Sequence, residues 1–401
     1  MGDNSDSITA AADNDSAGSW FQRNRDLIVR LVIAAALHYV FLLAISTMGG
    51  AFKLFVKDFA RKMIERCTNP VVGLFIGILA TSIIQSSGTT TSMIVVFVSG
   101  VDMVDGKGMP LSFAIPMIMG ANIGTTITNV LVSFSFVARR EDFRRAFAGA
   151  TVHDFFNLLS VVLLFPLEVK FQLIERLALK LTDVFTGAGG ITFANPLKII
   201  TDPIRHGVEN FLLDSLGFGR GLTGVILILV SAAAVVLSLL YLIRTMRQLV
   251  VERAEPYINR YLFRNDFTAF VLGVILTFLV HSSSVTTSLM VPLVGAGVVA
   301  LERCYPFTLG ANIGTTTTCL LASLTVVSSG SSACVTAAFA HLLFNLLGIS
   351  VFYPLRIVPI TLAKRLGALA AESKKWALVF VVMTFFGIPM LMIMLCRGSA
   401  S

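Results

Sequence analysis

The chain contains an internal duplication, and this feature constrains its fold more than any other. An eight-residue segment beginning at Gln85 corresponds to one beginning at His281, with five positions identical. Three more landmarks follow in the same order at offsets of 190, 188 and 188 residues: Gly120-Ala-Asn-Ile-Gly-Thr-Thr126 with Gly310–Thr316, His153-x-x-x-Asn157 with His341-x-x-x-Asn345, and Pro166-Leu with Pro354-Leu. Self-similarity of this kind indicates repeated structural units, so we expect two related halves.

The scarcity of charge places these halves in a membrane. Only 13% of the 401 residues are charged and 55% are hydrophobic, whereas soluble domains carry about 25% charged residues. So few charges cannot cover a water-exposed surface, which argues against a soluble enzyme, a nucleic-acid-binding protein or a disordered chain. The net charge of +8 then indicates Lys and Arg in cytoplasmic loops, following the positive-inside rule.

Seven apolar stretches reach the length of about 20 residues that a membrane helix needs. They are 27–49, 110–137, 146–167, 222–244, 306–327, 333–353 and 376–396. Two other regions consist of pairs too short to cross, each pair separated by a hydroxyl cluster: 71–84 with 91–101, and 272–280 with 289–299. Each pair predicts a re-entrant hairpin with a polar tip, because irregular backbone at membrane depth must be buried or line a cavity.

Three predicted spans separate the two hairpins, and an odd number of crossings inverts the second unit. We therefore predict an all-α integral membrane protein with inverted-topology repeats, each with a re-entrant helical hairpin and discontinuous helices, a signature of secondary transporters. The basic connection Arg139–Arg145 and the N-terminus should be cytoplasmic, and the uncharged equivalent connection 326–333 should lie on the other side. The basic segment Lys53–Arg66 conflicts with this scheme and is interpreted as an interfacial amphipathic helix.

The predicted organisation divides the chain into seven parts. These are a disordered tail (1–26), a first span with the amphipathic helix (27–69), repeat 1 (70–167), an extramembrane or interfacial connection (168–221), a linking span (222–265), repeat 2 (266–354), and a C-terminal span with a short tail (355–401).

The two hairpin tips offer hydroxyls, one carboxamide and backbone N–H groups, without a fixed cation. Helix N-termini and hydroxyls suit an oxyanion, and hydroxyl oxygens can also ligate an alkali cation. The two tips together therefore predict an oxyanion site with alkali cations beside it. The alternative is that these Ser and Thr side chains bond back to their own helices or join neighbouring ones.

The two Gly-Ala-Asn-Ile-Gly-Thr-Thr segments supply oxygen ligands of the kind that interrupted transporter helices offer Na⁺. Their glycine spacing also suits close helix packing, and both roles can hold together. Asp154 is the one acidic residue in a predicted span near the repeats, and its equivalent is Leu342. A carboxylate there should face a cavity, a cation or a donor, with Asn157 on the same helix face; a pair with a neighbouring His is the alternative.

An enzyme is not expected. Adjacent His281 and Ser282 point about 100° apart on a helix, which is poor geometry for a nucleophile and its base. Gln85 occupies the equivalent place of His281, which accounts for this position without catalysis. Because no Walker A motif is present, ATP-driven transport is not expected either.

With these motifs in view, the sequence resembles the type II sodium–phosphate cotransporters over residues 27–396. The resemblance rests on the paired tips, the paired Gly-Ala-Asn-Ile-Gly-Thr motifs and the run Phe143–Asn157. It implies Na⁺-driven uptake of inorganic phosphate, mainly HPO₄²⁻, by alternating access, with Na⁺ as coupling ion and no cofactor. The predicted phosphate ligands, extended along the first cluster, are Gln85, Ser86, Ser87, Thr90, Thr91, Ser282, Ser283 and Ser284. The predicted sodium ligands are Asn122, Thr125, Asp154, Asn157, His281, Ser282, Asn312, Thr315 and Thr318.

The sequence departs from the family pattern at Gly88, in place of the third Ser of the first motif, and at His281, in place of Gln. The external loop of eukaryotic members is missing from 168–221, which predicts a bacterial inner (cell) membrane. A Na⁺ symporter of another oxyanion or a dicarboxylate is an alternative, although the Ser-Asn-Thr tips of dicarboxylate carriers are not seen. A phosphate channel or sensor is a further alternative. A homodimer is left open, and no nucleic acid partner is expected.

Overall fold

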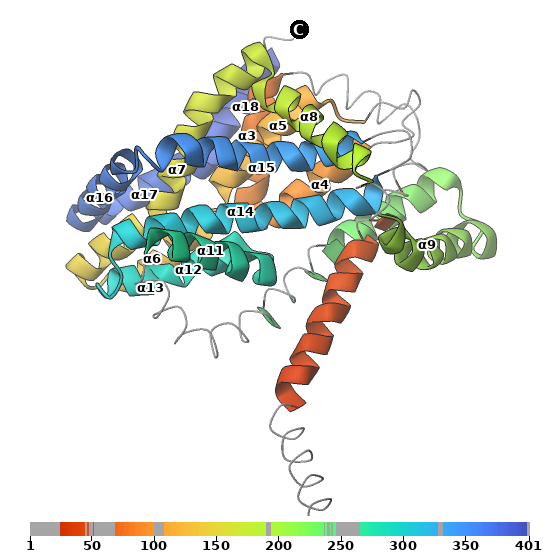
Figure 1. The fold of residues 1–401 in the computed structure, drawn as a ribbon, viewed down its shortest axis with the longest axis horizontal. Coiled ribbons are helices and arrows are strands. Elements are labelled where there is room, and N and C mark those ends of the chain that lie inside the picture. The colour runs from red at the N-terminus through yellow and green to blue at the C-terminus, as the bar shows by residue number, and fades with distance from the viewer. Residues whose placement is uncertain are drawn as a thin grey trace, which may run out of the picture.

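The computed structural model describes residues 25–44, 46–47, 51, 69–99, 108–189, 194–235, 237–238, 241, 244–245, 265–327 and 332–398. Every regular element in these ranges is helical (Figure 1). Five helices are long and apolar enough to cross a membrane: Arg25–Ala44, Leu111–Phe136, Arg140–Phe171, Ala333–Phe352 and Lys374–Cys396. The prediction of an all-α membrane protein is confirmed. The N-terminal tail and the segment Lys53–Arg66 lie outside the described residues.

The first half of the molecule contains two short helices, which are followed by the helices of the Gly-Ala-Asn-Ile-Gly-Thr-Thr motif and of the His153–Asn157 run. Its elements are α3 (Pro70–Ile84), α4 (Ser87–Ser99), α5 (Leu111–Gly124), α6 (Ile127–Ser133), the 3-10 turn η1 (Phe134–Phe136) and α7 (Arg140–Phe171). The second half repeats this order with α11 (Asp266–Val280), α12 (Ser283–Ser288), α13 (Met290–Gly295), α14 (Leu301–Val326) and α15 (Ala333–Phe352). Equivalent landmarks of the duplicated sequence therefore occupy equivalent elements.

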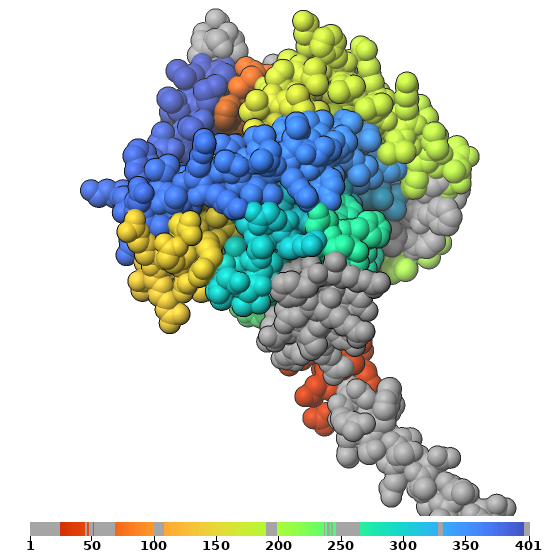
Figure 2. All heavy atoms as spheres, turned by 60° about the vertical axis from the view of Figure 1, so that its left-hand side comes forward, coloured from red at the N-terminus to blue at the C-terminus, as the bar shows by residue number. Residues whose placement is uncertain are grey.

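The connection between the halves and the C-terminal region are also helical. The connection contains α8 (Leu173–Gly187), α9 (Ala194–Asn210) and the π-helical turn η3 (Phe211–Ser215), and the C-terminal region contains α16 (Ile357–Glu372), α17 (Lys374–Val382), the π-helical turn η4 (Met383–Gly387) and α18 (Ile388–Gly398). Helix α8 packs on α15, where the Thr182 and Thr336 hydroxyls lie 3.0 Å apart. The surface view shows how closely α16, the start of α7 and the α13–α14 region lie together (Figure 2).

One predicted span, 306–327, differs from the structure. Helix α14 contains nearly all of 306–327, but it is not among the five helices apolar enough to cross a membrane. Its long run of Thr, Asn and Ser side chains explains this, and most of them are buried. Every described residue of the predicted span 222–244 is helical, and the part described without interruption, Arg220–Val235, is apolar.

The predicted interruption of the Gly-Ala-Asn-Ile-Gly-Thr-Thr helix occurs in the first half only. There a turn at Thr125 and Thr126 separates α5 from α6, whereas the equivalent segment continues inside α14. In α14 the hydroxyls of Thr315, Thr316 and Thr317 bond back to carbonyl oxygens three or four residues earlier, which is compatible with an unbroken helix. The Thr126 hydroxyl instead bonds outside its helix, to His153.

Glycine sets the same close helix crossing in both halves. A Cβ atom built on Gly120 of α5 would lie 2.0 Å from the carbonyl oxygen of Leu74 in α3. A Cβ on Gly310 of α14 would lie 2.0 Å from the carbonyl oxygen of Phe270 in α11. Any larger residue would force the backbones apart, so the packing role predicted for the small residues is present at these crossings. The first arm of each helical pair is thereby fixed to the motif helix of its own half.

Candidate functional site

The two short helical pairs turn at equivalent residues with the same unusual backbone. Gln85 ends α3 with φ 59°, and His281 ends α11 with φ 56°. Each residue donates its backbone N–H to a carbonyl oxygen four residues earlier, Thr81 or Thr277, at 2.7 Å. A positive φ is uncommon for a residue other than Gly, and strained conformations of this kind concentrate at functional sites. Two residues join the helices of each pair, Gln85–Ser86 and His281–Ser282, so the two turns are built alike.

The hydroxyl cluster belongs mostly to the second helix of each pair, not to an irregular tip. Helix α4 begins at Ser87 and α12 begins at Ser283, directly after the turns. The Ser86 Oγ accepts from the Thr89 backbone N–H at 3.2 Å, and the Ser282 Oγ accepts from that of Val285 at 3.4 Å. Both serines therefore act as N-caps. Their oxygens accept hydrogen bonds from the helix, which leaves the hydroxyl proton able to donate to an anion.

Hydroxyls one turn further along bond back to their own helices. Thr90 donates to the Ser86 carbonyl at 3.0 Å and Thr91 to the Ser87 carbonyl at 2.8 Å. In α12, Thr286 and Thr287 do the same, at 3.0 and 2.7 Å. The back-bonding alternative therefore applies to these threonines. Their oxygens can still coordinate a cation or accept a hydrogen bond, but their hydroxyl protons are already donated to helix carbonyls.

The two tips touch one another. A Cβ atom built on Gly88, in the first turn of α4, would lie 3.4 Å from the carbonyl oxygen of His281 and 3.6 Å from the Thr318 methyl group. The His281 Nδ1 atom lies 3.0 Å from the Thr318 hydroxyl. Two predicted sodium ligands are thus bonded to each other, and Gly88 leaves room beside them for a hydroxymethyl group.

Each second helix also contacts the motif helix of the other half. The Asn129 amide of α6 and the Thr287 hydroxyl of α12 are bonded, with the amide nitrogen 2.8 Å from Oγ1. The Ser284 hydroxyl donates to the Thr125 carbonyl at 3.3 Å. At the equivalent place, the Cys319 thiol of α14 lies 3.9 Å from the Thr91 carbonyl oxygen. This exchange of equivalent partners is what a two-fold relation between the halves would produce; the inverted orientation in a membrane stays a prediction.

A buried His–Asn network joins the centres of the halves. The His153 Nε2 atom contacts Asn312 Oδ1, and the Asn312 amide donates to Asn157 Oδ1 at 2.9 Å. In the reciprocal contact, His341 Nε2 lies 3.3 Å from Asn122 Oδ1. All five side chains are at most 3% exposed. Both His residues thus join helices through hydrogen bonds, and each His binds the motif Asn of the other half.

Asp154 lies beside this network, fully buried in α7, and neither of its carboxylate oxygens has a hydrogen-bond partner among the residues that the structure describes. The Thr126 hydroxyl approaches the carboxyl, yet its hydrogen bond goes to His153 Nδ1, 3.0 Å away. The alternative of an Asp–His pair is therefore not what the described residues form. A buried charge without a partner is costly, so this carboxylate calls for a cation or a proton.

The structure brings the predicted ligands into one buried region, with one exception. The buried members are Ser86, Ser87, Thr90, Thr91, Asn122, Thr125, Asp154, Asn157, His281, Ser282, Ser283, Ser284, Asn312, Thr315 and Thr318. Gln85 is exposed. Among the described buried residues there is no Lys or Arg, and the acidic ones are Asp154 and Glu168. Glu168 is accounted for, since it accepts from the Ile174 backbone N–H at the start of α8, at 2.6 Å.

Three polar residues of this region were not predicted. Asn129 bonds to the α12 hydroxyl cluster. The sequence signal for it is its equivalence to Cys319, 190 residues later, where the two halves have different residues. Thr128 is equivalent to Thr318, and its hydroxyl is buried without a partner. His38, from the N-terminal helix, has its ring centroid 4.9 Å from that of His281; an isolated His in an apolar span carries no sequence signal for this contact.

The fold and the site define a helical membrane protein whose two related halves share a buried polar centre, an arrangement typical of secondary transporters. The chain belongs to the Na⁺/Pi-cotransporter family, whose model matches residues 40–192 and 235–394.

The relatives of this chain are named as transport proteins. It is 30% identical to the sodium-dependent phosphate transport protein 2B of Pongo abelii and to that of Homo sapiens, over 90% of this chain and 65% and 64% of those proteins. It is 32% identical to the sodium-dependent phosphate transport protein 2A of Ovis aries, over 90% of this chain and 67% of that protein. The chain thus spans about two thirds of their length. No solved structure matches it.

Proposed function

We propose that the protein is a secondary active transporter that couples Na⁺ entry to the uptake of inorganic phosphate by alternating access in a bacterial inner membrane. The observation that carries the proposal is the contact between the two tips, where Gly88 of the first half lies against the His281 carbonyl and the Thr318 methyl group of the second. A buried carboxylate, Asp154, whose oxygens have no hydrogen-bond partner among the described residues, accompanies it. Family membership supports it, because the relatives are named as sodium-dependent phosphate transport proteins.

The charges of the buried region explain why sodium would be required. Phosphate enters mainly as the dianion HPO₄²⁻, and the described buried residues include no Lys or Arg to neutralise it. Hydroxyl and backbone donors stabilise an oxyanion but leave its charge uncompensated in a medium of low dielectric constant. Co-bound Na⁺ would supply that compensation. Binding of the anion and binding of the cation would then each favour the other, which is thermodynamic coupling.

The proposed roles follow the hydrogen bonding of each side chain. Ser86 and Ser282 have hydroxyl protons that can donate to phosphate oxygens, with Gln85, Ser87 and Ser283 completing the set of donors. Ser284 already donates to the Thr125 carbonyl, so we assign its oxygen to an accepting contact. Thr90 and Thr91 use their protons within α4, so we assign their oxygens to accepting contacts. Asp154 would hold one Na⁺, with the amides of Asn122, Asn157 and Asn312 around it. Thr125, Thr315, Thr318, Ser282 and His281 would hold Na⁺ nearer the tips.

A thermal unfolding assay of the purified protein tests the substrate. Phosphate, sulfate and succinate are each added as Na⁺ or K⁺ salts, and the shift in Tm is measured. Phosphate with Na⁺ should stabilise most, by about 2.7 kcal/mol when phosphate is present at 100 times its Kd. Greater stabilisation by sulfate or by succinate would favour the other oxyanion or dicarboxylate symporter, and a phosphate effect equal in K⁺ would favour a channel or sensor.

Two alanine variants provide the matched comparison. Ser283→Ala should remove most of the phosphate effect. Ser350→Ala changes an exposed hydroxyl in α15 that bonds to the Leu347 carbonyl, so it should leave the effect unchanged. Equal responses of the two variants would contradict the assignment of the tip as the phosphate site.

A further inference from the structure

A basic site lies near the start of α7, the start of α14 and α16, away from the tips. A cavity of about 580 Å³ opens there between the start of α7, the segment joining α13 to α14, and α16. Four basic side chains line it: Arg144, Arg145, Arg303 and Lys364. Glu302 is the one acidic residue among the described lining residues, so the lining carries a net charge of +3. Figure 2 shows the three parts of the chain side by side on one face.

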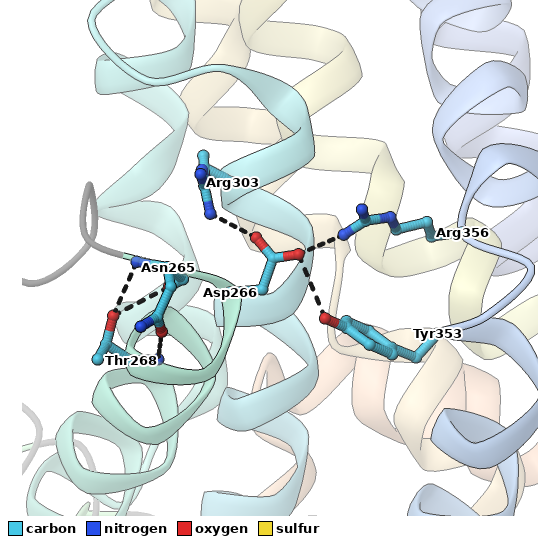
Figure 3. A network of polar contacts seen from close by, with 6 residues as sticks. All are labelled: Asn265, Asp266, Thr268, Arg303, Tyr353 and Arg356. Carbon is cyan, nitrogen blue, oxygen red and sulfur yellow. Dashed lines mark hydrogen bonds and ion pairs between the residues drawn. The ribbon is translucent and has the colours of Figure 1, made fainter.

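Ion pairs hold the cavity walls in place. Asp266, at the start of α11, accepts from Arg303 at 2.6 Å, from Arg356, and from the Tyr353 hydroxyl at 3.2 Å (Figure 3). Arg145 donates through Nε to the Gly295 carbonyl at 3.0 Å and through Nη2 to Asp142 at 2.8 Å. These contacts fix the positions of two arginines that face the cavity.

The same side chains keep donors for a ligand. A guanidinium has five N–H donors and an ammonium has three. Arg144 bonds to Glu141 through Nε and Nη2, and Lys364 bonds to Glu302 at 2.5 Å. The side chains of Arg144 and Lys364 are 49% and 54% exposed. Each basic group is therefore anchored, still has unused donors, and can be reached from outside.

The remaining wall is apolar and mostly buried, with one exposed side chain. It is formed by Ala148, Val294, Val298, Val299 and Leu301, of which Val298 is 51% exposed. The positive-inside rule assigns this basic end of the molecule to the cytoplasmic face. Basic pockets between helices on that side suit the head groups of anionic lipids, whose first acyl carbons need apolar contact.

We propose that this cavity binds the phosphate group of an anionic phospholipid, at a site distinct from the buried polar centre. Inorganic phosphate offers the same chemistry to Arg144, Arg145, Arg303 and Lys364, and the experiment separates the two sources. Glu302 opposes the ligand, because the hydrogen bond from Lys364 holds the pKa of its carboxyl below the ordinary value and keeps it charged. Removing this charge should therefore strengthen binding.

Native mass spectrometry of the purified full chain measures the binding of cardiolipin, phosphatidylglycerol and phosphatidylcholine, in potassium salts without Na⁺. Cardiolipin and phosphatidylglycerol should bind more tightly than phosphatidylcholine. Lys364→Gln and Arg144→Gln should each weaken their binding about fivefold, the effect of about 1 kcal/mol per basic residue. Glu302→Gln should tighten binding by a similar factor, a gain that misfolding could not produce.

Two comparisons decide the outcome. Arg140→Gln changes an exposed arginine one turn before Arg144 that does not line the cavity, so it should alter binding less than twofold. If potassium phosphate displaces the anionic lipids and its effect is lost in Lys364→Gln, free phosphate is the ligand. Equal binding of the three lipids without phosphate competition, or an Arg140→Gln effect as large as that of Arg144→Gln, would overturn the proposal. Neither readout depends on transport.

Discussion

At the scale of single residues, the most informative group is the Asp154 carboxylate. It is fully buried, both oxygens lack a hydrogen-bond partner within the described part of the chain, and the second half has Leu342 in its place. An acidic group inside a membrane costs about 2.5–3.5 kcal/mol on insertion scales. A buried carboxylate is tolerated when a bound ligand neutralises its charge, and we propose that Na⁺ is this ligand.

Replacing Asp154 by Asn should therefore have opposite effects in the two salts. In K⁺ buffer the free energy of unfolding should rise by up to about 2.5–3.5 kcal/mol, because the unpartnered buried carboxyl group is gone. In Na⁺ buffer the stabilisation given by the ion should fall. Chemical denaturation in each salt measures both effects. Asp183→Asn, on the exposed side of α8, is the control and should change neither. An Asp154→Asn variant that responds to Na⁺ like the unmutated protein would refute the sodium role.

His281 should make transport more sensitive to acid than a glutamine would. Its Nδ1 atom is bonded to the Thr318 hydroxyl, and its ring lies against that of His38. Thr318 is a proposed sodium ligand, and an imidazolium beside it would repel Na⁺, whereas a carboxamide oxygen would ligate it. We expect His281→Gln to retain more Na⁺-dependent uptake than the unmutated protein at acid pH, where the imidazole would become protonated. Identical pH and Na⁺ dependence of the two proteins would contradict this role.

At the scale of elements, the duplicated sequence predicts the helical pairs and their partners well. The offsets of the repeat correctly identify α3 as the equivalent of α11 and α7 as the equivalent of α15. This succeeds because apolar runs and glycine positions are local features of the chain. The sequence predicts the location of the hydroxyl clusters less well. They form the first turns of α4 and α12, since Thr90 and Thr286 bond to their own helices. Sequence alone could not predict which hydroxyls would do so, nor that α14 would run unbroken.

The glycine crossings should be sensitive to a single methyl group. Gly310→Ala would place a Cβ atom 2.0 Å from the Phe270 carbonyl oxygen, which forces α11 and α14 apart. Overpacking of this kind costs about 1–3 kcal/mol. Gly207→Ala is the matched control, because a Cβ there meets nothing within 4 Å, and its helical position should gain about 0.5–1 kcal/mol. Thermal unfolding compares them; equal Tm values would show that the crossing tolerates a side chain.

At the scale of the whole molecule, ion pairs tie the end of the second half together. Asp266 accepts from Arg303 in α14 and from Arg356 beside α16 (Figure 3). Partial burial acts to raise the pKa of this carboxyl, but the hydrogen bond and charge of Arg356 outweigh it and hold the pKa below its ordinary value. No sequence pattern predicts these ion pairs, because Arg303 and Arg356 lie 37 and 90 positions from Asp266 in the chain.

The lowered pKa of Asp266 gives stability a defined pH dependence. Because the folded-state pKa lies below the unfolded value of about 3.9, the contribution is complete above that value and is lost as the pH falls through the folded-state pKa. Asp266→Asn should therefore lower Tm at neutral pH, and the difference from the unmutated protein should shrink below about pH 4. Melting curves across this range measure it. A constant difference at every pH would mean that the carboxylate charge does not matter.

The central claim is that the two halves bind phosphate and Na⁺ together and carry them across the membrane. Its most direct test is radiolabelled phosphate uptake into proteoliposomes containing the purified protein, with an inward Na⁺ gradient or an equal K⁺ gradient. The account predicts transient accumulation of phosphate above the external concentration with Na⁺ and only equilibration or no uptake with K⁺. Uptake that is the same with both cations, or absent with both, would contradict it.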